Sequence, residues 1–334
     1  MKNKPVCYEP NQIRPELYPG IPTFIGLPAA RTKEEIKGHD FCIMGTPWEG
    51  TSTFNGINGA DTCTQYIRAV SSRYSGYLPD FDFDIFDEFS GCDYGDCATK
   101  HGDREFTFRS VENYVTDILD AGAIPIIFGG DHGLSYPQFK AFARHYDGKV
   151  GLIHFDAHMD NCETFGDDPY ARCCPFHRCY DIEGFDPKHM VSVGIRGPRN
   201  HYKALQYARE AGASVITAWE SKEIGIKETI RRAIDIASDG TEAFYVTVCS
   251  DALDVANNLS GPNDHCGFTT YELAYMLHEC GLNGCKGFDF MEVLPCTDVH
   301  NASSHGACWM AIYMMSGMAA RLLRERGQAS GEKQ

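Results

Sequence analysis

The sequence predicts an α/β protein, a three-layer α/β/α sandwich built on a mostly parallel sheet. The first observation is a set of short apolar runs of strand length, such as Val150–Phe155. The second is that segments with helical spacing fill the gaps between these runs. The third is that acidic and imidazole side chains directly follow several of the runs. Strands that alternate with helices on both faces of a sheet produce this architecture.

The run at residues 123–128 ends in Gly129-Gly130-Asp131-His132-Gly133. Glycine tolerates positive φ, so we expect a sharp turn there that leaves His132 at the carboxyl end of a strand. The run at 150–155 is followed by Asp156-Ala157-His158-Met159-Asp160. Because side chains alternate along a strand, Asp156, His158 and Asp160 are expected on one side.

Two later runs end in the same way. Residues 244–248 lead to Cys249 and Asp251, which share a face, and residues 287–291 lead to Glu292. Open α/β sheets place their ligand crevices at the carboxyl ends of strands. Carboxylate oxygens suit hard cations and imidazole suits borderline ones, so the four strand ends together predict a divalent metal site. For any one segment alone, a solvated strand end is the alternative.

Helices are expected between the strands. Residues 111–119 have helical spacing and stop at Gly122, a residue suited to a helix C-terminus. Thr269 and Glu272 have the spacing of a capping box at the start of another helix. Residues 306–323 are apolar on almost every side but contain serine, glycine and arginine. This favours a helix in the core or an oligomer interface over a membrane span.

Length and composition favour one large domain over residues 1–334, with residues 1–35 as an N-terminal extension packed on it. The formal net charge of −16 argues against nucleic-acid binding and favours small cationic substrates. Fifteen scattered cysteines and an N-terminus without an apolar segment predict reduced thiols and a cytoplasmic location.

Four blocks of sequence carry a resemblance to a known family. They are Gly-Gly-Asp-His at 129–132, Asp-Ala-His-Met-Asp at 156–160, Asp-Ala-Leu-Asp at 251–254 and Glu-Val-Leu-Pro at 292–295. In order and spacing they resemble the signature blocks of the ureohydrolases, the family of arginase and agmatinase. Residues 23–28 and 43–47 are similar to the agmatinase branch. The resemblance implies the same three-layer fold and, commonly, trimers or hexamers, as a homo- or hetero-oligomer.

The resemblance also implies a binuclear site for nickel or manganese that activates a bridging hydroxide for attack on a guanidinium carbon. One metal would be held by His132, Asp156 and Asp160, and the other by His158, Asp156 and Asp251. Asp160 would also take part in catalysis.

Glu292 matches the family's catalytic acid, which pairs with the substrate's guanidinium. The alternative for Glu292 is a buried acid paired with an arginine of the protein itself.

The chain departs from the family pattern at several positions. Cys249 replaces a second bridging aspartate; a thiolate ligand would favour nickel, zinc or copper over manganese. Alternatively, Cys249 is a small buried residue beside a site that holds one metal or none. Asp254 is a further candidate ligand that could turn toward the site. Arg172 stands where the family has a loop histidine, with His177 nearby as a substitute, and both are candidates for binding substrate. The substrate loops near residues 58–62 and 255–266 are also rewritten.

Three functions are compatible with these observations. The first is a metal-dependent amidinohydrolase that cleaves a C–N bond of a guanidino or biguanide compound; guanidine hydrolase and metformin hydrolase are candidate activities by similarity. The second is a catalytically impaired subunit of a hetero-oligomer with an intact paralogue, which Cys249 and Arg172 motivate. The third is a metal-independent scaffold. The number of metal ions per chain separates the first from the third.

Overall fold

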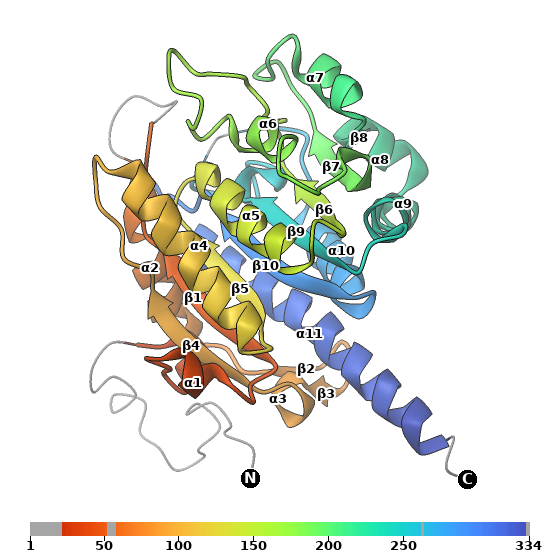
Figure 1. Ribbon diagram of the computed structural model, residues 1–334. Helices are drawn as coiled ribbons and strands as arrows, with labels where there is room; N and C mark the ends of the chain where they lie inside the picture. The colour runs from red at the N-terminus through yellow and green to blue at the C-terminus, as the bar shows by residue number, and fades with distance from the viewer. Residues whose placement is uncertain (1–21, 52–57, 262–263, 332–334) are drawn as a thin grey trace.

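A parallel sheet of eight strands forms the centre of the molecule (Figure 1). A computed structural model describes residues 22–51, 58–261 and 264–331. Every pairing in this sheet is parallel. From one edge to the other the strands are β4 (Gly91–Asp96), β1 (Phe41–Thr46), β5 (Ile124–Gly129), β10 (Cys285–Met291), β9 (Ala243–Cys249), β6 (Val150–Phe155), β7 (Met190–Ile195) and β8 (Ser214–Thr217). A separate antiparallel pair joins β2 (Tyr77–Leu78) to β3 (Phe83–Asp84).

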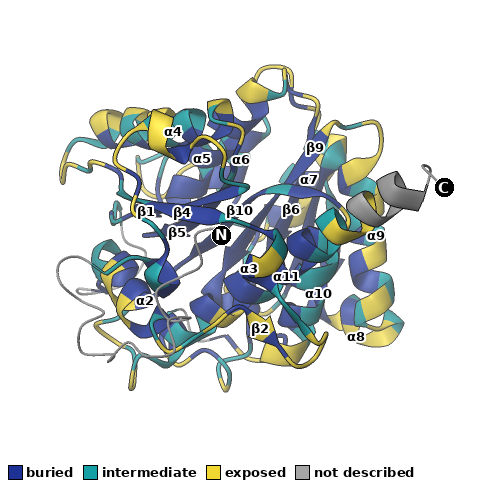
Figure 2. Ribbon diagram, turned by 90° about the horizontal axis from the view of Figure 1, so that it is seen from below, coloured by how far each residue is buried: buried dark blue, intermediate teal, exposed yellow. Residues whose placement is uncertain are grey.

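Helices cover both faces of the sheet, as the sequence predicts (Figures 1 and 2). Successive strand residues point to opposite faces: Ile126 and Val246 belong to one core cluster, while Ile127 and Tyr245 belong to the other. The first cluster is completed by α2 (Cys63–Ser71), α9 (Ile226–Ser238), α10 (Thr270–Leu282) and α11 (Ala302–Gly331). The second is completed by α1 (Lys33–Ile36), α4 (Arg104–Asp120), α5 (Ser135–His145) and α6 (Pro175–Cys179). The remaining helices are α3 (Ile85–Glu88), α7 (Ala204–Ala211) and α8 (Ala218–Ile224).

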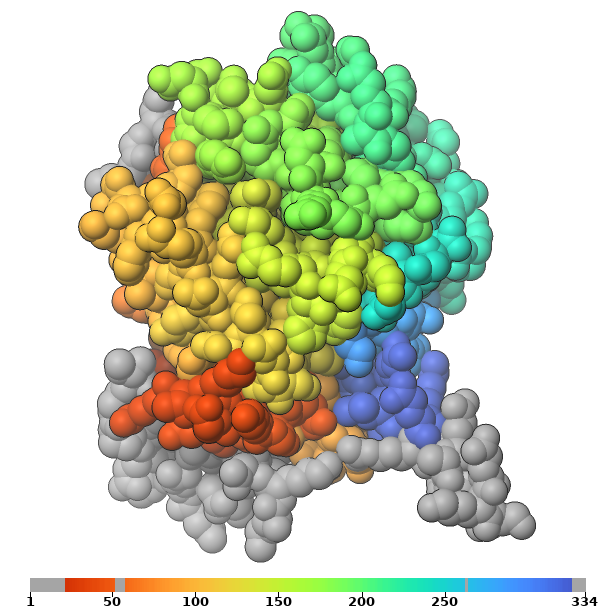
Figure 3. Space-filling view, viewed as in Figure 1, coloured from red at the N-terminus to blue at the C-terminus, as the bar shows by residue number. Residues whose placement is uncertain are grey.

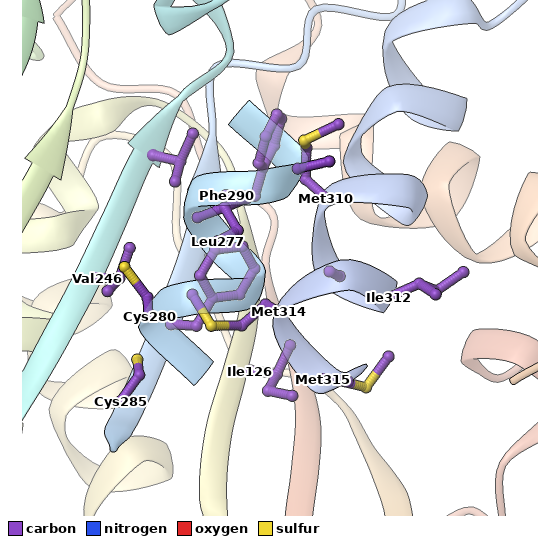
Figure 4. Close-up of a cluster of buried hydrophobic side chains, with 14 of the residues drawn as sticks. Ile126, Val246, Leu277, Cys280, Cys285, Phe290, Met310, Ile312, Met314 and Met315 are labelled. Atoms are coloured by element: carbon purple, nitrogen blue, oxygen red, sulfur yellow. The ribbon is translucent and has the colours of Figure 1, made fainter. Parts of the chain in front are cut away.

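The apolar segment predicted as a core helix is the middle of α11. Figure 4 shows Met310, Met314 and Met315 of α11 beside Leu277 of α10 and Phe290 of β10. These side chains are fully buried or nearly so, which confirms the core position. One face of the helix differs from the prediction, because Trp309 is about half exposed.

Glycines let α10 and α11 approach closely. A Cβ on Gly317 would lie 2.0 Å from the carbonyl oxygen of His278, and a Cβ on Gly281 would lie 2.3 Å from that of Met314. The absence of a side chain therefore brings the two backbones together where they cross. The glycine that interrupts the apolar pattern thus serves packing between helices, and Ser316 forms a hydrogen bond with His278 of α10.

The predicted helix ends are present. Thr269 accepts a hydrogen bond from the Glu272 amide and Glu272 accepts one from the Thr269 amide, so α10 begins with the expected capping box. Helix α4 ends at Asp120, and Gly122 follows with φ of +84°. These local patterns form because each depends only on residues within a few positions of one another.

The glycines after β5 act differently from the prediction. Gly129 and Gly130 do not have positive φ. Instead, a Cβ on Gly130 would lie 1.8 Å from the carbonyl oxygen of Trp48, and one on Gly129 would lie 2.2 Å from Met291 Sδ. These glycines are required because neighbouring chain segments pass against the strand end, and not because of a left-handed turn.

The first part of the predicted N-terminal extension, residues 1–21, lies outside the described residues. From residue 22 onward the segment packs on the domain: Phe24 is buried and its amide donates to Asp93 of β4. Within the part of the chain that the structure describes, no helix combines the length and apolarity needed to cross a membrane. The fourteen cysteines of that part are all free thiols.

The connections that follow the strands form one side of the molecule. Helices α6 and α7, from the segment after β6 and β7, lie at the top of Figure 1. The space-filling view shows this green segment continuous with the surface of α4 and α5 (Figure 3). The residues that follow β5, β6, β9 and β10 lie beneath it, because these four strands are neighbours in the sheet.

Candidate metal centre

The four predicted strand ends meet at one site. Strands β5, β10, β9 and β6 are adjacent and parallel, so their carboxyl ends lie at the same edge of the sheet. His132 follows β5, Asp156 follows β6, Asp251 follows β9 and Glu292 follows β10. The side chains of all four are buried. The sequence therefore predicted correctly which segments come together.

The first group of candidate metal ligands surrounds His132. Its Nδ1 lies 2.9 Å from Asp156 Oδ2 and 3.0 Å from Asp160 Oδ2, while its Nε2 lies 3.1 Å from Thr247 Oγ1. Burial lowers the pKa of His132, but the two carboxylates outweigh burial and raise it well above its ordinary value. The ring is thus fixed on both sides and faces two carboxylates.

The second group surrounds His158. Its Nδ1 lies 3.1 Å from Asp251 Oδ2 and 3.5 Å from Asp156 Oδ1. Asp251 Oδ1 accepts the amide of Ala157. Among the residues that the structure describes, no donor makes a well-aligned hydrogen bond to Asp251 Oδ2, which is buried. Asp156 belongs to both groups and joins them.

The chemistry of these side chains fits divalent cations. Ligand atoms of Asp156, His158 and Asp251 lie within 4.8 Å of one another, as do those of His132, His154 and Asp156. Burial and the charge of Asp156 raise the pKa of Asp160 to about 6. Several acids crowded in a site shielded from water are unfavourable unless cations compensate them. Asp251 Oδ2, which is buried and has no aligned donor among the described residues, is a candidate ligand atom within the second group.

His154 joins the site, although the sequence reasoning did not include it. Its Nε2 lies 3.0 Å from Asp156 Oδ2 and its Nδ1 lies 3.0 Å from Ser192 Oγ. Burial lowers the pKa of His154 to about 4, so the ring is neutral at physiological pH. The signal was present in the sequence, because His154 lies two positions before Asp156, so the alternation used for Asp156 and His158 puts it on the same side.

Asp264 is a second residue that the sequence reasoning missed. Its Oδ2 lies 3.3 Å from His158 Nε2 and 2.8 Å from Arg199 Nη1, and its side chain is largely buried. A carboxylate on the outer nitrogen of a metal-binding histidine fixes its ring orientation. Asp264 lies in the rewritten loop after Asp254, so no pattern near the strand ends could have indicated it.

Cys249 lies inside the site. It is buried and lines the same pocket as Asp251 and Glu292. Burial, and then the charges of Asp156 and Asp251, raise the pKa of its thiol well above the ordinary value. Without a cation the group is therefore a neutral thiol.

Asp254, the suggested substitute for Cys249, instead accepts hydrogen bonds from the amides of Ala256 and Gly267 and stabilises its own loop.

Glu292 pairs with an arginine of the chain itself. Its Oε2 accepts a hydrogen bond from Arg172 Nη1 at 3.0 Å, and its Oε1 accepts the amide of His132 at 2.8 Å. Arg172 Nη2 also donates to Glu49 Oε1 at 2.6 Å. Burial raises the pKa of Glu292 to about 7, against the opposing effect of Arg172. This is the alternative arrangement considered for Glu292 from the sequence.

Glu49 is the third residue that was missed, although a signal for it exists in the sequence. It follows β1, which pairs with β5, so it occupies the same edge of the sheet as His132. The rule that identified the other acids from the ends of apolar runs would also have identified Glu49.

His177 does not join the site. It lies on α6, where its Nδ1 contacts the carbonyl oxygen of Asn161 at 3.1 Å and its ring packs edge-on against Tyr207. It is not among the residues that line the pocket. The prediction that it replaces the family's loop histidine is not supported by this placement, because Arg172 reaches Glu292 whereas His177 contacts Asn161.

A pocket of about 290 Å³ opens beside the two groups. This volume suits a small ligand. The residues that line it come from the ends of β6, β9 and β10 and from the loops above them: His158, Met159, Asp160, Asn161, Cys162, Phe165, Arg172, Cys173, Arg199, Asn200, His201, Ala204, Cys249, Asp251 and Glu292.

Comparison with known proteins agrees with this geometry. The arginase family matches residues 39–317. Guanidinopropionase of Pseudomonas aeruginosa is 31% identical over 86% of this chain and 88% of its own length. Proclavaminate amidinohydrolase of Streptomyces clavuligerus is 31% identical over 84% of this chain and 88% of its own length.

Solved structures give the same result for the fold. The structure of the Streptomyces clavuligerus proclavaminate amidinohydrolase superposes with a TM-score of 0.83 at 28% identity, covering 91% of this chain and 99% of that one. A formiminoglutamase from Trypanosoma cruzi with Mn²⁺, at 22% identity and a TM-score of 0.80, shares the fold; the alignment covers 90% of this chain and all of that one.

The ureohydrolase resemblance, the three-layer fold and the enzyme class at family level, hydrolases of C–N bonds in linear amidines, are thus confirmed. The chain belongs to the arginase family.

Proposed function

We propose that this chain is a metal-dependent amidinohydrolase that cleaves a C–N bond of a guanidino or biguanide compound. The observation that carries the proposal is the pair of ligand groups joined by Asp156 at the edge of a small pocket. The two curated relatives above, an amidinohydrolase and a guanidinopropionase by name, support the substrate class. The net charge of −16 favours a cationic substrate.

Each of the two groups would supply the ligands of one divalent cation. His132, Asp156 and Asp160 would hold one, and His158, Asp156 and Asp251 the other. Bound cations would lower the pKa of a water molecule and supply hydroxide near neutral pH. Mn²⁺ suits the carboxylate and imidazole set, whereas ligation by the Cys249 sulfur would shift the preference to nickel.

The chain's own residues orient the substrate in this proposal. Glu292, fixed by the His132 amide, would pair with a guanidinium, and Asp160, which lies beside His132, would hold a proton. A volume of about 290 Å³ supports a small or N-alkylated substrate. The specific activities that we propose are hydrolysis of guanidine and hydrolysis of metformin. A cytoplasmic location and a trimeric or hexameric assembly belong to the same proposal.

The test is hydrolysis by the purified chain loaded with nickel or manganese. We expect urea or an amine to be released from at least one member of a panel containing guanidine, agmatine, guanidino acids and metformin. The Asp156→Asn variant should bind less metal and lose this activity, because Asp156 belongs to both ligand groups. Absence of product with every metal tested would contradict activity of the lone chain.

A second function is favoured by the pairing of Glu292 with Arg172. In this alternative the chain is a catalytically impaired subunit that completes a hetero-oligomer with an intact paralogue. The acid that would bind substrate already holds an arginine, and Cys249 replaces a carboxylate. Both features reduce what this site can do alone.

Mixed assemblies separate the two functions. If this chain is impaired, activity should require the paralogue, and Asp156→Asn in this chain should leave the activity of the mixture unchanged. If this chain is catalytic, the same substitution should reduce that activity. Co-purification of the two chains would be measured in parallel, so that loss of assembly is not mistaken for loss of catalysis.

A further inference from the structure

We propose that Glu49 and Glu292 form a guanidinium-binding site that the chain's own Arg172 occupies. Arg172 would then decide whether a free guanidinium can reach these acids. The inference deepens the proposed function and rests on it, because Glu292 is the acid assigned there to the substrate. Glu49 is a new member of the site, and Arg172 acts as an internal ligand that sets specificity.

Arg172 forms an ion pair with each of the two acids. Arg172 Nη1 donates to Glu292 Oε2 at 3.0 Å, and Nη2 donates to Glu49 Oε1 at 2.6 Å. The side chains of Arg172 and Glu292 are only 4% and 3% exposed, and that of Glu49 is 15% exposed. Two carboxylates thus hold different nitrogens of one planar cation, the arrangement that guanidinium groups favour.

Groups other than Arg172 also hold the carboxylates of Glu49 and Glu292. Glu49 accepts hydrogen bonds from Asn58 Nδ2 at 2.8 Å and from the Ala60 amide at 3.3 Å. Glu292 accepts the His132 amide. These donors do not depend on Arg172. We therefore expect the two acids to stay in place when the arginine side chain is removed.

The backbone of Glu292 has an unusual conformation. This residue has φ of +61°, a conformation that non-glycine residues rarely adopt. Its amide donates to the Gly130 carbonyl oxygen, and its own carbonyl oxygen accepts the Ser250 hydroxyl at 2.6 Å. The hydroxyl of Ser250 is in turn fixed by Asn258. The structure thus maintains an unfavourable conformation that aims this acid at the guanidinium position.

The positive charge of Arg172 also acts on a third acid. Asp131, also buried, lies near the same cation and is held by the amides of Gly50 and Gly133. One arginine therefore pairs with two acids and acts electrostatically on a third. Removing it would leave buried carboxylates without a cation, which is strongly unfavourable. A small planar cation from solution would relieve this.

The position of the Arg172 guanidinium adjoins the pocket. Arg172 and Glu292 both line the 290 Å³ pocket. Truncation of Arg172 would join the space of its guanidinium to that pocket. Free guanidinium, which has the same donors without the aliphatic stem, is therefore the matching probe.

The experiment uses the full-length chain in the presence of a chelator, with guanidinium chloride as the probe. The concentrations are about 1–20 mM, the range of a weak small-ligand Kd and far below denaturing levels. Binding is measured by calorimetry and by the shift in Tm. We expect Arg172→Ala to unfold at a lower temperature than the wild type, and guanidinium to bind it and recover part of that loss. The wild type should bind at least about tenfold more weakly, since charge-assisted hydrogen bonds contribute more than 1.4 kcal/mol.

Two controls make the result specific. Tetramethylammonium chloride at the same concentration supplies a cation without donors and should not recover the Tm. Arg104→Ala removes a partly buried arginine, which pairs with Asp168; neither residue lines the pocket. Guanidinium should not rescue this variant. Equal rescue of Arg104→Ala would overturn the proposal, because the effect would then be non-specific.

A second substitution tests Glu49. In the Arg172→Ala background, Glu49→Gln should weaken guanidinium binding at least about tenfold, because one of the two charged acceptors is lost. If Arg172→Ala does not fold, Arg172→Ser, whose short side chain also leaves the guanidinium space open, takes its place. Failure of the folded variant to bind guanidinium more tightly than the wild type would overturn the proposal.

The outcome is independent of hydrolysis. Binding is measured without metal, so an inactive chain can still show the occupied site. Conversely, activity of the wild type on a guanidino substrate without guanidinium binding by the arginine variants would leave the proposed function standing and refute this inference.

Discussion

At the scale of single residues, Asp156 organises the site. Three imidazole rings lie within 3.5 Å of its carboxylate: those of His132, His154 and His158. Burial opposes its ionisation, but these rings outweigh burial and hold the pKa of Asp156 well below its usual range. The ligand groups are therefore assembled by hydrogen bonds within the protein itself.

Asp264 provides the first prediction at this scale. Asp264→Asn should lower metal affinity by about 10–100-fold, because it removes the charge that orients the outer nitrogen of His158. The measurement is metal content after dialysis against graded chelator. Asp235→Asn, on the exposed face of α9, is the matched control and should retain wild-type metal content. Equal metal retention by both variants would show that Asp264 does not position the ring.

Asp289 provides a prediction of pH dependence. Its carboxylate is buried and accepts hydrogen bonds from the hydroxyls of Thr247 and Tyr245. Burial raises the pKa of Asp289 to about 6. Between the unfolded pKa near 4 and this value, the unfolded chain releases a proton that the folded protein retains. Asp289 therefore lowers stability progressively as pH rises from about 4 to about 6.

The Asp289→Asn variant should lack this contribution. Relative to the wild type, its free energy of unfolding should improve by about 2 kcal/mol between pH 4.5 and pH 7. Urea denaturation of both proteins at several pH values measures the difference, so that other titrating groups cancel. A difference that stays constant across this range would refute the assignment.

At the scale of elements, an ion-pair network joins α2 to the edge strand β4. Arg68 of α2 donates from Nε and Nη2 to the two Asp93 oxygens and from Nη1 to Asp96, and it is almost fully buried. Asp93 also accepts the amide of Phe24. One arginine thus connects a helix, a strand and the N-terminal segment.

Arg68→Met should therefore destabilise the protein by about 3–5 kcal/mol, because it leaves the buried Asp93 carboxylate without its cation. The free energy of unfolding in urea measures the loss. Arg231→Met on α9 is the matched control: Arg231 also pairs with two acids, Glu228 and Asp235, but these three side chains are 35–60% exposed. It should leave the midpoint almost unchanged. Similar losses in both variants would contradict this explanation.

At the scale of the whole molecule, the candidate metal ligands come from neighbouring strands in the middle of the sheet. Cations that bind only the folded protein stabilise it by mass action, by about 2.7 kcal/mol at one hundred times Kd. Adding Mn²⁺ or Ni²⁺ to the metal-free chain should raise its Tm, and excess chelator should reverse this rise. Asp156→Asn should abolish most of the effect. A wild-type Tm that does not respond to either metal would favour a scaffold without a metal centre.

The sequence predicted the architecture well because its signals are local. Burial of β6 and β9 follows from runs of adjacent apolar residues, and the capping box of α10 follows from two residues three positions apart. Strand alternation placed Asp156 and His158 on one face, and the parallel sheet then brought Asp251 and Glu292 beside them. Such patterns depend on neighbouring residues and on one general rule for parallel sheets.

What the sequence by itself determined is the family, the layers of the fold and the strand ends that form the site. Only the tertiary structure decided which groups these ends contact. Arg172 lies 120 positions from Glu292 and 123 from Glu49, and Asp264 reaches His158 from a rewritten loop. A buried acid needs a partner of opposite charge, but its type alone does not say whether that partner is a substrate or an arginine of the same chain. That choice depends on how loops distant in sequence pack above the sheet.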